Sequence, residues 1–350
     1  MKFYTLMVTM MVWLFASFMI ACRKENEEVP QADSYRLEVP PHFPQPKYVF
    51  ENNTVSKAGF ELGRMLFYDP ILSLDSSTSC GSCHQNFVAF AHSGHVKSHG
   101  IDNQFTLRNS PVIFNLAWQS EFFFDGGVNH IENISTAPIT NSLEMDETLA
   151  HVVYKLNRSS RYKLKFKNVF NKDSIDSQQL LRAMTQFIGT MVSANSKYDK
   201  HLTKTPSLTE EELEGLSLFT QKCASCHSGN LFSDFSYRNN GLSATFTNDT
   251  GREHVTTLAS DLGKFKVPTL RNIALSLPYM HDGSIKTLDD VLEHYRTGIV
   301  HSATLDPLFD QGNGVYAIPM TDSEKQKIIA FLNTLTDHTF VTNPKFSDPF

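Results

Sequence analysis

The sequence predicts a mainly α-helical chain of two domains in series, and three observations support this prediction. Apolar residues at helical spacing dominate around two Cys-x-x-Cys-His motifs, strand signals are weak throughout, and the motifs begin 143 residues apart, at Cys80 and Cys223. The chain has 350 residues, 41% of them hydrophobic, so it can bury two separate cores. We expect domains at residues 51–200 and 207–345 and a polar linker at 195–207; one large domain is the alternative.

Capping signals place three helices around the motifs. Residues 60–67 have helical apolar spacing, and this helix should stop at Asp69-Pro70. Capping boxes at residues 209–212 and 321–324 should open two further helices, one leading into Cys223 and one near the C-terminus. The buried stripe of the last helix should consist of Ile328, Leu332 and Leu335. The Gly-, Ser- and Asn-rich residues 228–252 should form a long loop.

The N-terminus has the features of an export signal that ends in a lipid-modified cysteine. A basic residue precedes an apolar run from Met7 to Ile20, and Ala21-Cys22 follows. We expect residues 1–21 to be a signal peptide, Cys22 to carry lipid and residues 22–50 to form a flexible spacer. An uncleaved membrane anchor is the alternative, and either would tether an exported periplasmic or cell-envelope protein to a bacterial membrane.

The remaining four of the five cysteines form two pairs, each followed directly by histidine: Cys80-Gly-Ser-Cys83-His84 and Cys223-Ala-Ser-Cys226-His227. This is the attachment pattern of c-type haem, in which both thiols bond to the porphyrin and the histidine ligates the iron. A zinc ribbon would place its two cysteine pairs about 15–20 residues apart. A redox dithiol would not explain a histidine at the same place twice. We therefore expect two covalently bound haem c groups, one in each domain.

The charge balance argues against nucleic acid as a partner. The formal net charge is −6 and the isoelectric point is near 6.2. This composition leaves no broad basic field of the kind that binds phosphate backbones.

Beyond the haem motifs, a series of ordered landmarks resembles the bacterial di-haem cytochrome c peroxidases, whose superfamily includes the MauG-type enzymes. The resemblance covers roughly residues 55–337. Its landmarks are Leu62-Gly63-Arg64-Met65-Leu66-Phe67, Arg108-Asn109-Ser110-Pro111, Asp125-Gly126, Glu144-Met145, Leu270-Arg271-Asn272-Ile273-Ala274 and Pro278-Tyr279-Met280-His281-Asp282-Gly283.

The resemblance implies that the first haem is the peroxide site and that the second accepts and stores electrons. His84 and His227 would be the proximal iron ligands, and Glu144 would be the acid and base of the distal pocket. O–O cleavage requires such a group, because a proton must move from one peroxide oxygen to the leaving one. Without the resemblance, Glu144 would be taken for a solvated surface residue.

Helix geometry and the resemblance together suggest Tyr295 as distal ligand of the second iron. A helix from Thr287 to about Gly298 would place Tyr295 on the face of Leu288, Val291 and Leu292, with His294 pointing away alongside Glu293 and Arg296. Classical family members have Met at this position, whereas MauG-type enzymes have Tyr. A phenolate should lower the potential of this iron. The alternative is that Tyr295 is a core aromatic residue and that Met280 or Met320 is the ligand.

Other positions depart from the classical pattern or match it more weakly. Phe124 stands where classical members have a Trp between the haems, and Ile134 stands where some have a distal Gln. Resting enzymes of the family can cap the first iron with a loop histidine, for which His99 fits the spacing better than its neighbours His92 and His95. The family also holds a calcium ion between the domains, and its ligands correspond to Asn109, Ser276 and Pro278.

The leading prediction is therefore a cytochrome-c peroxidase. It would reduce hydrogen peroxide with electrons from a small soluble cytochrome or cupredoxin, and it would pair as a homodimer as relatives often do. A MauG-type oxidase acting on a protein substrate is the runner-up, which Tyr295 favours and Phe124 opposes. An electron carrier with two six-coordinate irons is the third possibility, against which Glu144 is the main argument.

Overall fold

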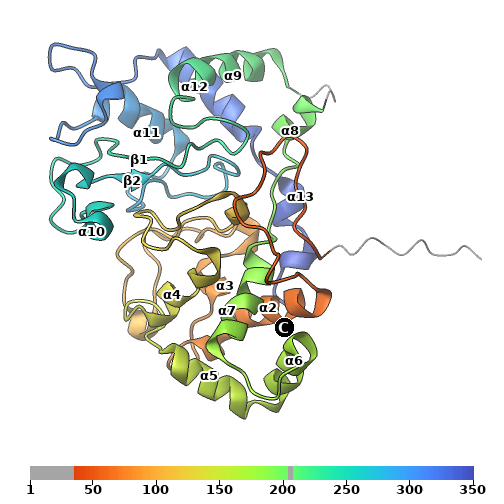
Figure 1. The fold of residues 1–350 in the computed structure, drawn as a ribbon. Helices are drawn as coiled ribbons and strands as arrows, with labels where there is room; N and C mark the ends of the chain where they lie inside the picture. The colour runs from red at the N-terminus through yellow and green to blue at the C-terminus, as the bar shows by residue number, and fades with distance from the viewer. Residues whose placement is uncertain (1–34, 204–207) are drawn as a thin grey trace, which may run out of the picture. The chain divides into compact units, whose positions relative to one another are not determined.

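The computed structural model describes residues 35–203 and 208–350 (Figure 1). Helices dominate these residues, and their only two named strands are β1 (Tyr237–Arg238) and β2 (Phe265–Lys266). These strands pair antiparallel, with Tyr237 opposite Lys266. The expected mainly α fold with little strand is thus confirmed. In the same described residues, no helix combines the length and the apolar character that crossing a membrane requires.

The α-helices are short and are joined by long loops. In chain order they are α2 (Lys57–Tyr68), α3 (Cys80–Cys83), α4 (Thr136–Thr140), α5 (Leu149–Arg158), α6 (Ser160–Phe170), α7 (Ser177–Ile188), α8 (Lys197–Leu202), α9 (Glu210–Lys222), α10 (Glu253–Thr256), α11 (Leu288–Glu293), α12 (Asp322–Asn333) and α13 (His338–Val341).

The helices expected from the capping signals form where the sequence places them. Helix α2 ends before Asp69, because the carboxylate of Asp69 accepts from the N–H of Ile71 and starts a new turn at Pro70. Thr209 and Thr321 cap α9 and α12 in complete capping boxes.

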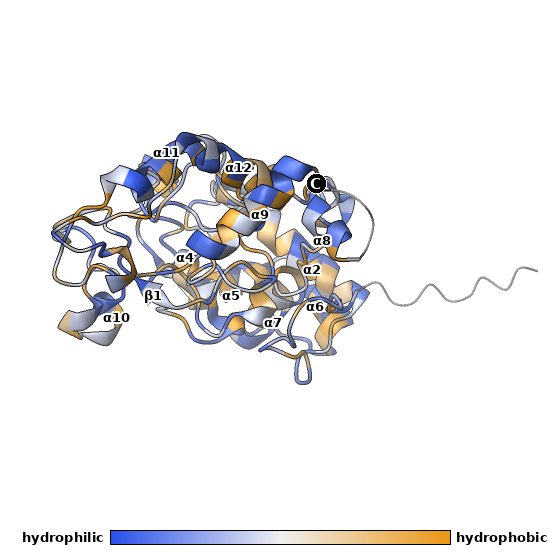
Figure 2. Ribbon diagram, turned by 90° about the horizontal axis from the view of Figure 1, so that it is seen from above, coloured by the Kyte–Doolittle hydropathy of each residue, from blue (hydrophilic) through white to orange (hydrophobic). Residues whose placement is uncertain are grey.

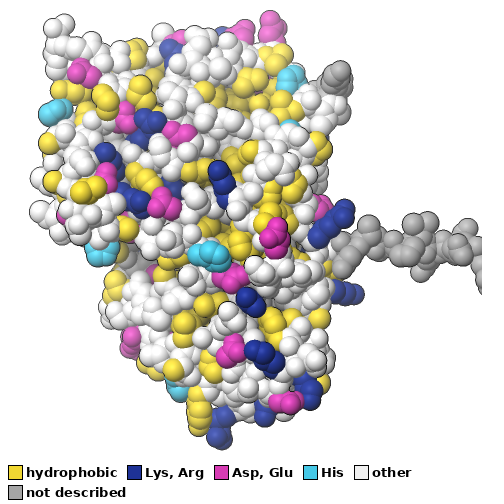
Figure 3. All heavy atoms as spheres, in the orientation of Figure 1, with side chains coloured by type: hydrophobic (Ala, Val, Ile, Leu, Met, Phe, Trp, Pro, Cys, Tyr) yellow, Lys and Arg dark blue, Asp and Glu magenta, His cyan; other side chains and the backbone are white. Residues whose placement is uncertain are grey.

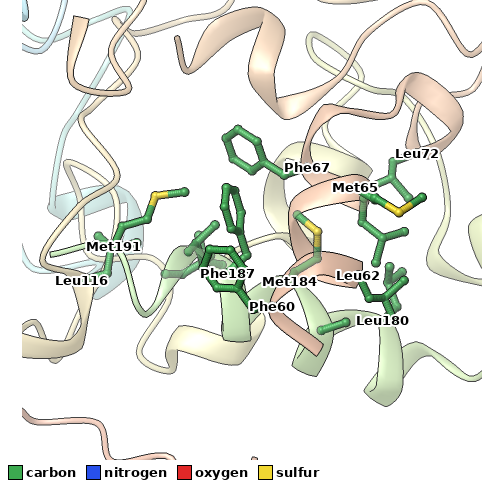
Figure 4. Close-up of a cluster of buried hydrophobic side chains, with 14 of the residues drawn as sticks. Phe60, Leu62, Met65, Phe67, Leu72, Leu116, Leu180, Met184, Phe187 and Met191 are labelled. Carbon is green, nitrogen blue, oxygen red and sulfur yellow. The ribbon is translucent and has the colours of Figure 1, made fainter. Parts of the chain in front are cut away.

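The first half of the chain is built around α2 packed against α7. Phe60, Phe67 and Phe187 meet edge to face within this core (Figure 4). Gly63 lies at the crossing, where a Cβ atom would overlap the backbone carbonyl oxygen of Ala183. The close approach of α2 and α7 therefore depends on a glycine at this position. The C-terminal segment returns to this core through Phe340.

The second half repeats this helix pair with α9 against α12. Gly215 lies at their crossing, where a Cβ atom would overlap the carbonyl oxygen of Lys327 and approach Phe331. Ile328, Leu332 and Leu335 are buried, which confirms the expected stripe. Figure 2 shows hydrophilic and hydrophobic residues side by side on both helices, as their amphipathic role requires.

A second structural correspondence relates the two halves. Thr-Leu-Arg-Asn occurs at residues 106–109 and again at 269–272, and each copy is followed by a hairpin bridge, Phe122 to Val128 and Tyr279 to Ile285. Each hairpin contacts the opposite half of the chain: the N–H of Lys266 donates to the carbonyl of Phe124, and the N–H of Asn109 donates to that of His281. The two halves are therefore interlocked by equivalent hairpins.

The described part of the expected spacer, residues 35–50, does not behave as a flexible segment. Phe43 is buried with Trp118 and Leu231, and Trp118 donates its indole N–H to the carbonyl of Pro44. An aromatic side chain in a polar, proline-rich stretch thus docks the segment onto the fold. The expected signal peptide and Cys22 lie outside the described residues.

The expected polar linker also contains structure. Helix α8 occupies residues 197–202, because Ser196 and Asp199 form a capping box. The side chain of Asp199 is buried and pairs with Arg271, with His42 as a second partner. Residues 204–207 lie outside the described part of the chain.

Charged residues of both signs are interspersed on the face shown in Figure 3, with no field of a single sign. This distribution agrees with the small net charge.

Replacing Gly63 by Ala should destabilise the protein. A helical alanine normally gains about 1 kcal/mol over glycine, but here its Cβ meets a backbone carbonyl that cannot move away. We expect the free energy of unfolding to fall by ~1–3 kcal/mol, measured by denaturant titration. The control is Gly127→Ala, whose Cβ would meet side chains and no backbone, with the Asp125 carboxylate at 3.2 Å and Val255 at 3.7 Å. An equal or more stable Gly63→Ala variant would contradict the proposed crossing.

Candidate active site at the two cysteine motifs

The first motif forms a single helical turn followed by its histidine. Helix α3 spans Cys80 to Cys83, and both thiols are free of disulfide bonds. The Nδ1–H of His84 donates to the carbonyl of Phe90 at 2.8 Å, since a carbonyl can only accept. Ala89 and Phe90 both have left-handed backbone conformations, which turn this carbonyl back toward the imidazole. His84 therefore has its Nε2 free to bind a metal.

The second motif has the same arrangement. Cys223 ends α9, Cys226 follows one turn later, and neither forms a disulfide. The Nδ1–H of His227 donates to the carbonyl of Phe232 at 3.2 Å, and Phe232 is again left-handed. Burial lowers the pKa of His227, as it does that of His84, and so favours the neutral imidazole that ligates metals.

These donor sets fit covalently attached haem better than the alternatives. Burial raises the pKa of the Cys80 thiol to about 12, and that of Cys223 likewise to about 12. A redox dithiol needs a lowered thiol pKa, so this chemistry does not match. Among the described residues, no three His, Cys, Asp or Glu side chains form a cluster that could hold a metal ion by themselves. Two thiols and one oriented imidazole per motif match the needs of a c-type haem.

Glu144 lies beside the first motif. A carboxylate charge on Glu144 raises the pKa values of both Cys80 and Cys83, although burial is the larger cause for each thiol. Burial also raises the pKa of Glu144 above its usual range, while the Asn141 amide donates to its Oε1 at 2.8 Å. Glu144 is therefore half-buried and hydrogen-bonded, not a fully solvated surface residue. A carboxyl group in this environment can hold a proton closer to neutral pH than an exposed one.

The backbone of Glu144 is fixed by the loop that follows the first motif. A Cβ atom at Gly100 would overlap the carbonyl oxygen of Leu143 and lie 2.6 Å from the Cα of Glu144. The N–H of Ile101 donates to the carbonyl of Glu144 at 2.9 Å. Gly100 thus permits a close approach that brings the loop and the carboxyl-bearing segment together.

The three loop histidines have different environments. His92 is buried, hydrogen-bonds to Ser98 at 2.7 Å and stacks on His95, which is exposed. Burial lowers the pKa of His92 to about 4. His99 hydrogen-bonds through Nδ1 to Asn103 at 3.0 Å and packs against Phe105. Its Nε2 is left available.

Tyr295 lies next to the second motif. Burial raises the pKa of its phenol to about 12, and charges on Cys226 and Cys223 act in the same direction. The Asn240 amide, which also donates to the sulfur of Met280 at 3.3 Å, opposes this shift. Met320 instead packs against the hydrophobic core of the second half.

The expected outward orientation of His294 is wrong. The residues from His294 to Gly298 form a π-helical turn after α11, which Thr287 caps as expected. His294 itself keeps α-helical dihedral angles and is buried because the segment containing Asn240 covers it: its Nε2 hydrogen-bonds to the carbonyl of Asn240 at 3.0 Å. Both His294 and Tyr295 therefore face inward.

The expected calcium ligands lie on either side of the interlocked hairpin. Asn109 is buried, and its amide donates to the carbonyls of His95 and Val96. Ser276 and Pro278 precede the hairpin whose His281 carbonyl accepts from the backbone of Asn109 at 2.8 Å.

The structure also shows the surroundings of the two positions that depart from the classical pattern. Phe124 lies in the hairpin that contacts β2, and its carbonyl accepts from Lys266 at 2.7 Å. Ile134 is buried in the first hydrophobic core and brings no polar group to it.

The known proteins that are similar to this chain point to one family. A family model described as di-haem cytochrome c peroxidase matches residues 57–207. The chain is 34% identical to a cytochrome c551 peroxidase of Nitrosomonas europaea over 79% of each chain. It is 32% identical to the methylamine utilization protein MauG of Methylorubrum extorquens, over 86% of this chain and 83% of that protein.

A solved structure described as a MauG-like protein associated with microbial copper homeostasis has a TM-score of 0.81 and 30% identity. The match covers 89% of this chain and 98% of that one. With oriented histidines at both motifs and relatives that match most of its length, the chain belongs to the di-haem cytochrome c peroxidase family.

Proposed function

We propose that this protein is a peroxidase that reduces hydrogen peroxide to two waters. The reaction takes up two protons and two electrons, and each electron comes from a separate molecule of a one-electron donor protein. The observation that carries this proposal is Glu144, a half-buried carboxyl group with a raised pKa beside the first Cys-x-x-Cys-His motif. A plain electron carrier has no use for such a group, because its reaction moves no proton between oxygen atoms.

The chain would hold its two haem c groups in two tandem cytochrome c-type domains. Cys80, Cys83 and His84 would bind the first haem in residues 51–200. The second haem would lie in residues 207–345, bound by Cys223, Cys226, His227 and, on the distal side, Tyr295. When bound, the haems supply the iron that binds peroxide and the electrons that reduce it. The repeated helix crossings at Gly63 and Gly215 support the tandem arrangement.

Glu144 would move the proton on which O–O cleavage depends. Its ionised carboxylate would take the proton from one peroxide oxygen, and its protonated form would give it to the leaving oxygen. The Asn141 amide holds Oε1, so one carboxylate oxygen stays fixed during both steps. Ile134 offers no second polar group, so Glu144 would carry this role without a polar side chain at that position.

Further parts of the proposal concern the resting state of the first iron, a calcium ion, and the location and partners of the protein. His99 would be the residue that caps the first iron in the resting state, and its available Nε2 supports this role. Asn109, Ser276 and Pro278 would hold a calcium ion. The protein would be exported to the periplasm or cell envelope, held there through Cys22, and would form homodimers. A small cytochrome or cupredoxin would be the electron donor.

A second candidate function is oxidation of a protein substrate in the manner of the MauG-type enzymes. The position of Tyr295 beside the second motif favours this function, because a phenolate ligand stabilises oxidised iron. The similarity to MauG and to a MauG-like structure supports it as well. Phe124 opposes it, since phenylalanine is hard to oxidise and cannot relay charge as Trp does.

Glu144→Gln should retain both haems and lose most peroxide turnover, by a factor of ~10²–10⁴. The amide is nearly isosteric but cannot accept and return the proton. Steady-state oxidation of a reduced cytochrome would measure the loss. Asp146→Asn, two residues away and exposed, is the matched control and should keep normal activity. Full activity of Glu144→Gln would remove Glu144 from the mechanism.

Tyr295→Phe should change the optical and electron paramagnetic resonance spectra of one haem only. The substitution removes the phenolic oxygen and keeps the ring that packs against Phe309. Tyr154→Phe, at an exposed position, serves as the control. Unchanged spectra of both haems in Tyr295→Phe would show that another residue, such as Met280, is the ligand.

A further inference from the structure

Three successive backbone carbonyls after the second motif each accept a hydrogen bond from a different side chain. The carbonyl of Asn230 accepts from Arg271 Nε at 2.7 Å, and that of Leu231 accepts from the Thr269 hydroxyl at 2.6 Å. The carbonyl of Phe232 accepts from His227 Nδ1. Thr269 and Arg271 therefore hold in place the peptide chain that accepts from His227, and the backbone of Pro268, next to Thr269, is a further hydrogen-bond partner of His227.

Arg271 is buried and has several fixed partners. Its side chain is 0% exposed, and two of its nitrogens reach the two carboxylate oxygens of Asp199 at 2.7 and 2.9 Å. Its guanidinium lies over the ring of Phe43, 4.6 Å from the centroid, and 5.8 Å from the ring centroid of Phe232. A buried, bidentate pair of this kind holds a fixed geometry, because either charge left alone would be costly.

The docked N-terminal segment completes this cluster. His42 hydrogen-bonds to Asp199 at 2.8 Å, and its own backbone carbonyl accepts from the Asn230 amide. Residues 42–43 thus cover the far side of Arg271 and hold the same loop that bears Phe232. Four separate chain segments, at residues 42–43, 199, 230–232 and 269–271, are thus linked around Arg271.

The described residues of the first half have no equivalent set of side-chain hydrogen bonds. Phe90, whose carbonyl orients His84, is held by backbone hydrogen bonds to Gln85 and by apolar packing against Phe67 and Phe340. Thr106, the counterpart of Thr269, donates instead to the carbonyl of Arg108 within its own segment. Only the second of the two equivalent segments reaches the carbonyls that follow its motif.

We propose that Thr269 and Arg271 are positioning residues for His227, which fix the Phe232 carbonyl and thereby tune the second haem. This inference rests on the proposed role of His227 as iron ligand. A firm Nδ1–H bond to a carbonyl makes the imidazole a stronger donor, which favours oxidised iron and lowers the reduction potential. Loosening the carbonyl should therefore shift the potential of this haem upward.

The test uses Thr269→Val in the full-length di-haem protein. This change keeps the shape of the side chain and removes only the hydroxyl that holds the Leu231 carbonyl. A potentiometric titration followed optically should show a more positive midpoint potential for the second haem and an unchanged one for the first. The haem whose spectrum changes in Tyr295→Phe identifies the second. Arg271→Lys, which keeps the charge and loses the fork, should shift the same potential in the same direction.

Thr106→Val is the matched control, because it removes the equivalent hydroxyl of the first half. It should leave the second haem at its wild-type potential. An unchanged second potential in Thr269→Val would overturn the inference, and so would an equal shift in Thr106→Val. Absence of a second covalent haem in the wild-type protein, shown by a pyridine haemochrome assay, would instead contradict the proposed function.

Discussion

The candidate site depends on one hydrogen bond made twice, from a histidine Nδ1–H to a backbone carbonyl a few residues further along the chain. In both halves this carbonyl belongs to a phenylalanine in a left-handed conformation, Phe90 or Phe232. Such a conformation costs energy for a bulky residue and persists only where its surroundings enforce it. The packing around each phenylalanine enforces it, and an imidazole with a fixed orientation is the result, as the proposed iron ligand requires.

The two halves enforce this geometry by different physical means, and this difference matches the roles proposed for their haems. Around Phe90 the support is apolar. Around Phe232 it is a buried ion pair and a row of side-chain hydrogen bonds. A rigid polar support suits a centre that holds a defined potential. The first centre instead has Glu144 nearby, for which we propose a role in proton exchange.

Much of this arrangement could be predicted from the sequence, because it depends on local patterns. The capping boxes predicted α9 and α12, and the spacing of the cysteine motifs predicted a repeat. The paired Thr-Leu-Arg-Asn segments are also visible in the sequence and are a further sign of that repeat. Glu144 could be singled out only through the resemblance, since no local pattern predicts that a carboxylate is half-buried.

The features that could not be predicted depend on long-range contacts. The polar segment before residue 50 looks flexible in the sequence, but in the structure Phe43 packs against Arg271 and His42 hydrogen-bonds to Asp199. Residues 42 and 199 are more than 150 positions apart. Helical periodicity placed His294 outward beside Glu293 and Arg296, and it could not show that Asn240, 54 residues earlier in the chain, covers this histidine. In both cases tertiary packing overrides the local signal.

The central claim is that the first haem site reacts with peroxide, and adding one equivalent of peroxide to the purified di-haem protein tests it most directly. Electron paramagnetic resonance and optical spectra should show a high-spin haem that disappears on mixing, followed by rapid oxidation of an added reduced cytochrome. Two low-spin haems that remain unchanged by peroxide, even after half-reduction of the protein, would contradict the account and leave an electron carrier.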